Sequence, residues 1–364
     1  MKKLLIASAA LAMVAGTVQA QSSVEIYGVL DKAYSNLESK VTASGSTTKT
    51  ETTTTGGSGN GGGGAAPQQN YTTERIGFRG TEDLGGGLKA NFVYEARIGA
   101  LDTLTATTDS GDETGTMPTR LAFVGLSGGF GSIAMGRQTS LMEAAWGAGN
   151  SSNTNNFVGT LYFSGQKFNN SRSDRLVTYT SPKMGAFNLA VQYGERDVKT
   201  TTTSSVTTGQ EEMTINLSYA AGPLTAVLSH TQEEANTASV VTAKPEATVF
   251  GANYNFGPAA AFVTYAEGKN KLPAGTATDR EAYEVGVRVP MKAWTFQAST
   301  YDGEDKVTAA ATKSDVSGYQ LSALYNFSKR TNLYAVIGSD EVKNTAAGTK
   351  TERETYGVGV RHQF

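Results

Sequence analysis

The sequence contains no cysteine, only two histidines and no long apolar run. Without cysteine, neither a disulfide nor a thiolate metal site can form. No stretch approaches the ~20 apolar residues that a transmembrane helix needs. The histidines, His230 and His362, fall in phase with apolar neighbours, so neither is placed as a general base in a cleft. These absences argue against a disulfide-stabilised domain, a helical membrane protein and an enzyme.

Other chemical signatures are missing as well. Basic strips interleaved with aromatic residues do not occur, so nucleic acid is not an expected partner. Clustered metal ligands are absent, although Glu233 and Glu234 could bind Ca²⁺ weakly. Ser229 precedes His230, but neighbouring residues of a strand point to opposite faces, which argues against a barrel hydrolase. We therefore expect no cofactor, no resident metal and no catalysed reaction.

Residues 1–20 have the features of a secretory signal peptide. Lys2 and Lys3 form the basic start, an apolar stretch follows, and residues 18–20 form a small-residue cleavage site. Removal of the signal leaves 29 basic and 33 acidic residues in 21–364, a net charge of −4. An exported chain without cysteine fits the periplasm or the outer membrane of a bacterium.

The mature chain repeats a unit of about ten residues in which apolar and polar side chains alternate. In 212–220, four large apolar residues point one way and polar residues point the other, and 281–290 and 318–327 repeat this pattern. The pattern predicts strands at 23–35, 70–81, 87–98, 117–127, 131–138, 174–181, 186–194, 211–221, 224–231, 245–255, 259–267, 281–290, 293–302, 316–327, 331–339 and 351–364.

Short turns that contain Gly or Pro alternate with long polar connections. The long ones are expected at 36–69, 99–116, 139–173, 195–210, 232–244, 268–280, 303–315 and 340–350. Short turns on one rim and long loops on the other are typical of an outer-membrane barrel, and ~16 strands leave an aqueous channel. We predict an all-β fold in one domain: a transmembrane antiparallel β-barrel of about sixteen strands with long outer loops.

Two of the long connections are unusual. Loop 36–69 is a Gly/Thr-rich, low-complexity segment, and we expect it to be a mobile outer loop. Loop 139–173 is irregular but rich in large apolar residues: Leu141, Met142, Trp146, Phe157, Leu161, Tyr162, Phe163 and Phe168. A long structureless loop within a domain is either functional or disordered. We predict that 139–173 folds into the lumen and narrows it.

Five stretches together resemble the trimeric general porins of Gram-negative bacteria. They are VEIYGVLD at 24–31, RIGFRGTEDLG at 75–85, TRLAFVGL at 119–126 with MGRQ at 135–138, YTSP at 179–182, and GVRHQF at 359–364. The resemblance implies an outer-membrane homotrimer in lipid and lipopolysaccharide, with the third outer loop as a constriction. It also implies that the barrel-assembly machinery recognises the final strand, with Phe364 as the signal.

The resemblance places constriction arginines at Arg75, Arg120 and Arg172. Alternation supports an inward Arg75, because Ile76 and Phe78 fall in the outward phase. It also predicts an inward Arg120, and it then places Ala122 and Val124 on the same inner face, where the inserted loop would cover them. Whether Arg172 or Arg175 faces the pore stays open, because a junction between loop and strand can exchange them.

Other charged residues complete the predicted pore. Glu143 is the only carboxylate within 139–173, and Glu95 is predicted to lie on the inner face of the third strand. Further inward charges are expected at Asp31, Arg79 and Arg97. Several arginines facing few carboxylates predict a throat with a modest preference for anions.

The sequence therefore favours a porin that lets ions and small hydrophilic solutes diffuse passively. One alternative is a substrate-selective porin with a specific polar site. A second is a surface adhesin or binding protein on the same barrel, in which the Thr/Gly loops do the work. The third is a soluble, exported all-β protein whose apolar faces meet a second sheet.

Overall fold

The computed structural model describes residues 23–57, 74–98, 119–152, 172–200, 206–237, 240–271, 277–307 and 312–364. The predicted signal peptide lies outside these residues. In the described part of the chain, no helix is long and apolar enough to cross a membrane.

The described residues form seventeen strands and one helix, all strands lying in one sheet. They are β1 (Ser23–Ala43), β2 (Ser46–Gly57), β3 (Arg75–Gly85), β4 (Leu88–Arg97), β5 (Thr119–Gly128), β6 (Gly131–Thr139), α2 (Met142–Gly149), β7 (Arg172–Thr180), β8 (Phe187–Thr200), β9 (Val206–Ala221), β10 (Leu224–Thr237), β11 (Val240–Asn255), β12 (Ala260–Lys271), β13 (Ala277–Met291), β14 (Trp294–Val307), β15 (Thr312–Asn326), β16 (Thr331–Asn344) and β17 (Thr349–Gln363).

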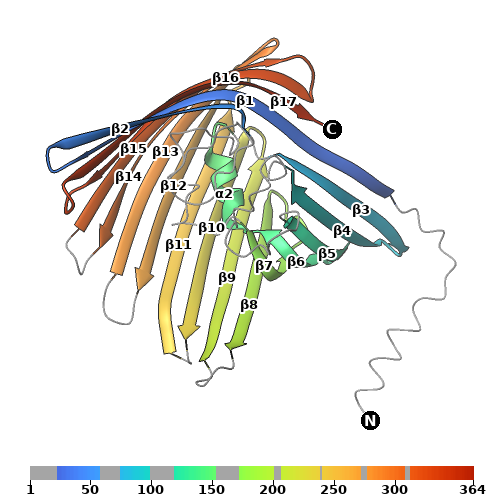
Figure 1. Cartoon of the computed structure of the whole chain (residues 1–364). Coiled ribbons are helices and arrows are strands. Elements are labelled where there is room, and N and C mark those ends of the chain that lie inside the picture. The colour runs from blue at the N-terminus through green and yellow to red at the C-terminus, as the bar shows by residue number, and fades with distance from the viewer. Residues whose placement is uncertain are drawn as a thin grey trace.

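The sheet closes on itself as an antiparallel barrel. β1 pairs with β17 on one side and with β3 on the other, and every strand from β3 to β17 pairs with the next. Sixteen strands form this wall, because β2 pairs only with β1, beyond the point where β3 ends. Figure 1 shows the curved wall with α2 on its concave side. The predicted fold class is confirmed.

The wall is apolar outside and polar inside. On β9, Met213, Ile215 and Leu217 are exposed, whereas Thr214 and Asn216 between them are buried on the inner face. Aromatic residues form two outward bands, which is the pattern of a barrel in a membrane. The band near the short turns contains Phe187, Tyr219, Tyr254, Phe256, Trp294, Tyr325 and Phe327, and the band nearer the long connections contains Tyr193, Tyr265, Tyr283, Tyr319 and Tyr356.

The strands extend further toward the outer rim than the sequence predicts. Within the loop predicted at 36–69, residues 36–57 form a paired hairpin of β1 and β2 in which Leu37 lies opposite Thr52, and 58–69 lie outside the described residues. The many threonines of β2 explain this, because β-branched residues suit extended backbone. Polar connections predicted at 232–244 and 340–350 are likewise largely strand. Above the membrane both faces of a strand meet water, so apolar alternation ends although backbone pairing continues.

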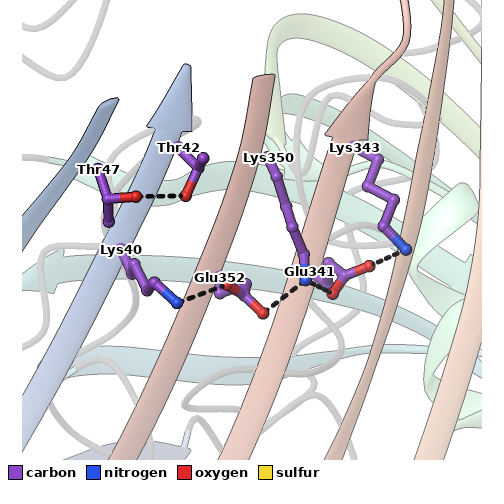
Figure 2. Close-up of polar contacts among 7 residues, drawn as sticks. All are labelled: Lys40, Thr42, Thr47, Glu341, Lys343, Lys350 and Glu352. Carbon is purple, nitrogen blue, oxygen red and sulfur yellow. Dashed lines mark hydrogen bonds and ion pairs between the residues drawn. The ribbon is translucent and has the colours of Figure 1, made fainter. Parts of the chain in front are cut away.

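Charged side chains connect the strands at this outer rim. Lys40 of β1 bonds Glu352 of β17 at 3.5 Å, and Lys350 lies between Glu352 and Glu341 at 2.6 and 2.8 Å. Lys343 of β16 completes the row at 2.6 Å from Glu341 (Figure 2). Alternating charges thus cross the seam where the first and last strands of the wall meet.

A buried glutamate fills a gap in the wall beside β1. The partner of β1 changes from β3 at Val29 to β2 at Ala33. Between them, Asp31 N donates to Glu74 Oε1 at 3.0 Å, and Lys32 Nζ lies 3.0 Å from Glu74 Oε2. Glu74 therefore replaces the missing strand partner with a carboxylate.

We predict that Glu74→Ala destabilises the barrel. The substitution removes the acceptor of a buried backbone N–H, which costs about 1–3 kcal/mol. The free energy of unfolding should fall by that amount in urea titrations of the refolded protein. Glu82→Ala removes an exposed carboxylate of β3, the strand that follows Glu74, and should change the free energy of unfolding by less than about 0.5 kcal/mol. Equal stability of the two variants would contradict the role assigned to Glu74.

Candidate functional site in the lumen

The inner face of β3, β4 and β5 carries a charged cluster centred on Glu95. Arg120 Nε lies 2.6 Å from Glu95 Oε1, and Arg75 Nε lies 3.5 Å from Glu95 Oε2. Tyr27 of β1 donates its hydroxyl to Glu95 Oε2 at 3.1 Å. One carboxylate, itself only 5% exposed, thus orients two arginines and a tyrosine toward the lumen.

Arg120 reaches the lumen because of a bulge in β5. Glu95 pairs with Leu121 and Ala96 pairs with Thr119, so Arg120 is the extra residue between two regular pairs. The prediction that Ala122 and Val124 share its inner face is wrong. Val124 is 64% exposed and pairs with the outward Phe92. A bulge of one residue reverses the alternation without leaving a signal in the composition.

A second bulge separates Arg172 from Arg175. Gln138 pairs with Ser173 and Gly136 pairs with Leu176, so β7 has one residue more than β6 over this interval. Arg175 is exposed and has a φ of 61°. Arg172 instead interacts electrostatically with Arg120 and Glu143. The structure therefore brings Arg172, and not Arg175, to the charged cluster.

The described part of the long loop, 139–152, lies inside the barrel. Helix α2 packs on the inner wall at β10, β11 and β12, where Met142 and Ala145 are buried. A Cβ at Gly251 would lie 1.7 Å from the Ala145 carbonyl oxygen, so only glycine allows this approach. The loop was predicted to fold inward, and in this part it does. It covers β10–β12, however, and not Ala122 and Val124 of β5.

Backbone groups at the start of α2 are held by polar side chains of the wall. Ser229 Oγ donates to the Leu141 carbonyl at 3.0 Å, and Asn216 Nδ2 donates to the same oxygen at 3.3 Å. Leu141 N in turn donates to Gln192 Oε1 at 3.3 Å. A polar inner wall thus provides the hydrogen bonds that an inserted loop needs.

Glu143 projects from the first turn of α2 into the field of the arginines. Burial raises the pKa of its carboxyl above the ordinary value, while Arg172, Arg120 and Arg75 act in the opposite direction. Within the described structure, no group donates a hydrogen bond to Glu143 Oε2. Glu143 is thus a carboxylate whose charge depends on the arginines across the lumen.

The remaining predicted residues occupy different places. Asp31 is on the inner face but fully buried, and it accepts a hydrogen bond from Tyr334 at 2.6 Å. Arg97 lies opposite Arg75 on β4 and belongs to the cluster. Arg79 lies apart from it, paired with Glu25 at 2.8 Å. Phe364 exchanges backbone hydrogen bonds with Gly28 at 3.0 and 3.1 Å, which ties the final strand to β1.

Sequence reasoning missed several inner polar residues. Tyr27 is in the phase of Asp31, so alternation alone could have identified it. Glu212 and Glu233 lie directly opposite each other on β9 and β10. The assignment of 232–244 to a loop concealed that pair. Glu212 accepts a hydrogen bond from Ser173, the neighbour of Arg172, at 2.7 Å, so acidic groups also line the lumen at β9 and β10.

The charges of the lumen cluster are unbalanced. Four arginines, Arg75, Arg97, Arg120 and Arg172, face two carboxylates, Glu95 and Glu143, which leaves an excess of positive charge. Charge rings in a narrow pore set ion preference. In the described residues, no cluster of three or more candidate ligands could hold a metal ion.

Known proteins with this sequence pattern and fold are bacterial porins. Residues 7–345 match the Gram-negative porin family. The chain is 31% identical to outer membrane porin protein 32 of Delftia acidovorans and 28% identical to an outer membrane porin protein of Bordetella pertussis, each over the full length of both chains. The solved anion-selective porin from Comamonas acidovorans has a TM-score of 0.66 at 23% identity, covering 94% of this chain and 100% of that chain.

The match in family, the length shared with these relatives and the closed barrel all lead to one assignment. Porins are channels, and these relatives give no support for an enzyme. The chain belongs to the Gram-negative porin family and is a β-barrel protein of the outer membrane.

Proposed function

We propose that the protein forms a water-filled channel for passive diffusion of ions and small hydrophilic solutes, with a modest preference for anions. The observation that carries this proposal is the arginine cluster around Glu95. In a throat with low-dielectric walls, an excess of positive charge lowers the energy of an anion and raises that of a cation. The similarity to a solved porin described as anion-selective supports the same preference for anions.

The constriction in this proposal is formed between α2 and the wall of β3–β5. The helix brings Glu143 to the arginines, since Arg172, Arg120 and Arg75 all act on its carboxyl. Solutes would pass between a mainly basic wall and a loop with one acidic group. Arg75, Arg120, Arg172, Glu95 and Glu143 are the proposed constriction residues, while Arg79 lies outside it.

We further propose a homotrimer surrounded by lipid and lipopolysaccharide. The outward apolar face of short strands such as β5 and β6 supports contact between subunits, and a structural relative, OmpT of Vibrio cholerae, is described in a trimer form. The pairing of Phe364 with Gly28 supports recognition of the final strand during assembly. The mass of the detergent-solubilised protein, measured by light scattering, tests the trimer.

Planar-bilayer recording tests the channel directly. In a KCl gradient, the reversal potential should have the sign of chloride preference, and the current should rise in proportion to voltage and salt. A clear cation preference would contradict the charge argument. Conductance that saturates and is blocked by one solute class would favour a substrate-selective porin instead.

We predict that Arg120→Glu sharply reduces chloride preference. The substitution changes the throat charge by two units, which at ~8 Å in water shifts chloride and potassium by about 1 kcal/mol each in opposite directions. Screening by salt roughly halves each shift, so the chloride-to-potassium permeability ratio should change roughly fivefold. Because Arg120 is largely buried and pairs with Glu95 at 2.6 Å, the substitution should also lower stability, so reversal potentials are compared for protein shown to be folded by circular dichroism. Arg79→Glu is the matched control, since Arg79 lies on β3 but outside the cluster. Equal effects of the two variants would argue against a special role for Arg120.

We also predict that acidification strengthens the preference for chloride. Because burial raises the pKa of Glu143, its carboxylate takes up a proton at a higher pH than an ordinary glutamate. As pH falls through that value, one negative charge leaves the throat, and the permeability ratio should rise by roughly twofold. Reversal potentials between pH 8 and pH 4 measure it. Glu143→Gln should already show the higher ratio at pH 8, with a smaller change. A wild-type ratio that falls on acidification would contradict the prediction.

A further inference from the structure

The inserted loop is held at a second place, just after α2. Asn150, Ser151 and Ser152 are at most 2% exposed, although they carry polar side chains. They follow an eight-residue helix that has no basic residue in its last turn. The carbonyl groups at a helix end need donors, and positive charge is favourable there. Asn253 of β11 donates to the Ala148 carbonyl oxygen in the last turn at 2.9 Å, and the wall strands β13 and β14 hold the chain just beyond the helix.

Arg288 of β13 is the main donor at this place. Its Nε donates to the Ser151 carbonyl oxygen at 2.7 Å, and its Nη2 donates to the same oxygen. Gln297 of β14 adds a third hydrogen bond at 3.0 Å. The guanidinium carbon also lies 4.8 Å from the ring centre of Phe262, a cation–π contact that fixes the plane of the guanidinium. Charge-assisted hydrogen bonds of this kind are the strong ones.

The neighbouring residues leave the loop little freedom. Asn150 Nδ2 donates to Glu284 Oε1 at 2.9 Å, and Asn150 Oδ1 accepts from Ser152 N at 3.1 Å. A Cβ at Gly286 would lie 2.7 Å from Ser151 Oγ, so the loop lies directly on the strand. This contact site is on the side of the lumen opposite the β3–β5 arginines in strand order.

We propose that Arg288 is a positioning residue that fixes the end of α2, and with it Glu143, and so sets the width of the throat. Arg288 faces the lumen, but its donors are directed at a loop carbonyl and not at the path of passing ions. Its removal should therefore disturb conductance and steadiness, whereas removal of Arg120 should disturb ion preference. This inference rests on the proposed channel function.

Arg288→Lys tests the proposal because it keeps the charge but loses the planar fork of donors. We expect more frequent transitions between conductance levels, with the time spent outside the main level increased on the order of tenfold, as expected for the loss of charge-assisted hydrogen bonds. The reversal potential should stay that of the wild type. Arg280→Lys is the matched control, because Arg280 is on the same strand and pairs with Asp305 at 3.0 Å.

A disulfide offers a rescue, since the chain has no cysteine of its own. The ideal Cβ position at Gly286 is 2.9 Å from Ser151 Cβ, so a small outward shift reaches the ~3.5–4.5 Å of a disulfide. In an Arg288→Lys protein carrying Ser151→Cys and Gly286→Cys, oxidation should restore steady current, and dithiothreitol should abolish it. Gln297→Ala, which removes one donor, should give a weaker form of the same unsteadiness if Arg288→Lys does not fold.

Steady wild-type-like current in both Arg288→Lys and Gln297→Ala would overturn the positioning role. That outcome would leave the channel itself untouched. Failure of the proposed function has a different signature, namely no conductance or a cation preference in the unmodified protein.

Discussion

The closure of the backbone hydrogen-bond ladder is the constraint on which the rest of this structure depends. In lipid, an unpaired N–H or C=O group finds no water, so a membrane-spanning sheet must have no edge. Here β1 carries the closure, paired with β17 on one side and with β3 and then β2 on the other. Where β3 gives way to β2, Glu74 accepts the N–H of Asp31. A side chain thus completes the ladder where β1 changes its strand partner.

A closed wall with an apolar outside leaves its polar side chains in the lumen, and the inserted loop uses them. Ser229 and Asn216 bind the loop before α2, and Arg288 and Gln297 bind it after α2. Two kinds of lumen arginine follow from this. One kind, such as Arg120, is held by a carboxylate and in the proposed channel acts on passing ions. The other, Arg288, is held by a backbone carbonyl and is proposed to position the loop.

The sequence alone was sufficient to predict the wall strands wherever one face of a strand meets lipid. There, alternation of apolar and polar residues shows whether each side chain points outward or into the lumen. Prediction from the sequence failed where both faces of a strand meet water and the alternation ends. The outer rim lacks alternation, so the sequence predicts loops at β2 and at the outer ends of β10 and β16, where the structure has strand. The bulge at Arg120 reversed the phase, so Arg120 faces inward while Ala122 and Val124 face outward, contrary to the alternation of the sequence. The path of the loop was not predictable either, since it depends on close contacts such as that of Ala145 with Gly251.

The pairing of β1 with β17 also determines when the wall can close during export of the chain. β17 follows every other wall strand in the chain, and contacts across the seam join residues as far apart as Gly28 and Phe364, whose positions differ by 336. Until β17 has crossed the inner membrane, β1 has an open edge that can pair with the wrong strand. The wall therefore cannot close before its last strand arrives, and an earlier strand that pairs wrongly in the meantime would block closure.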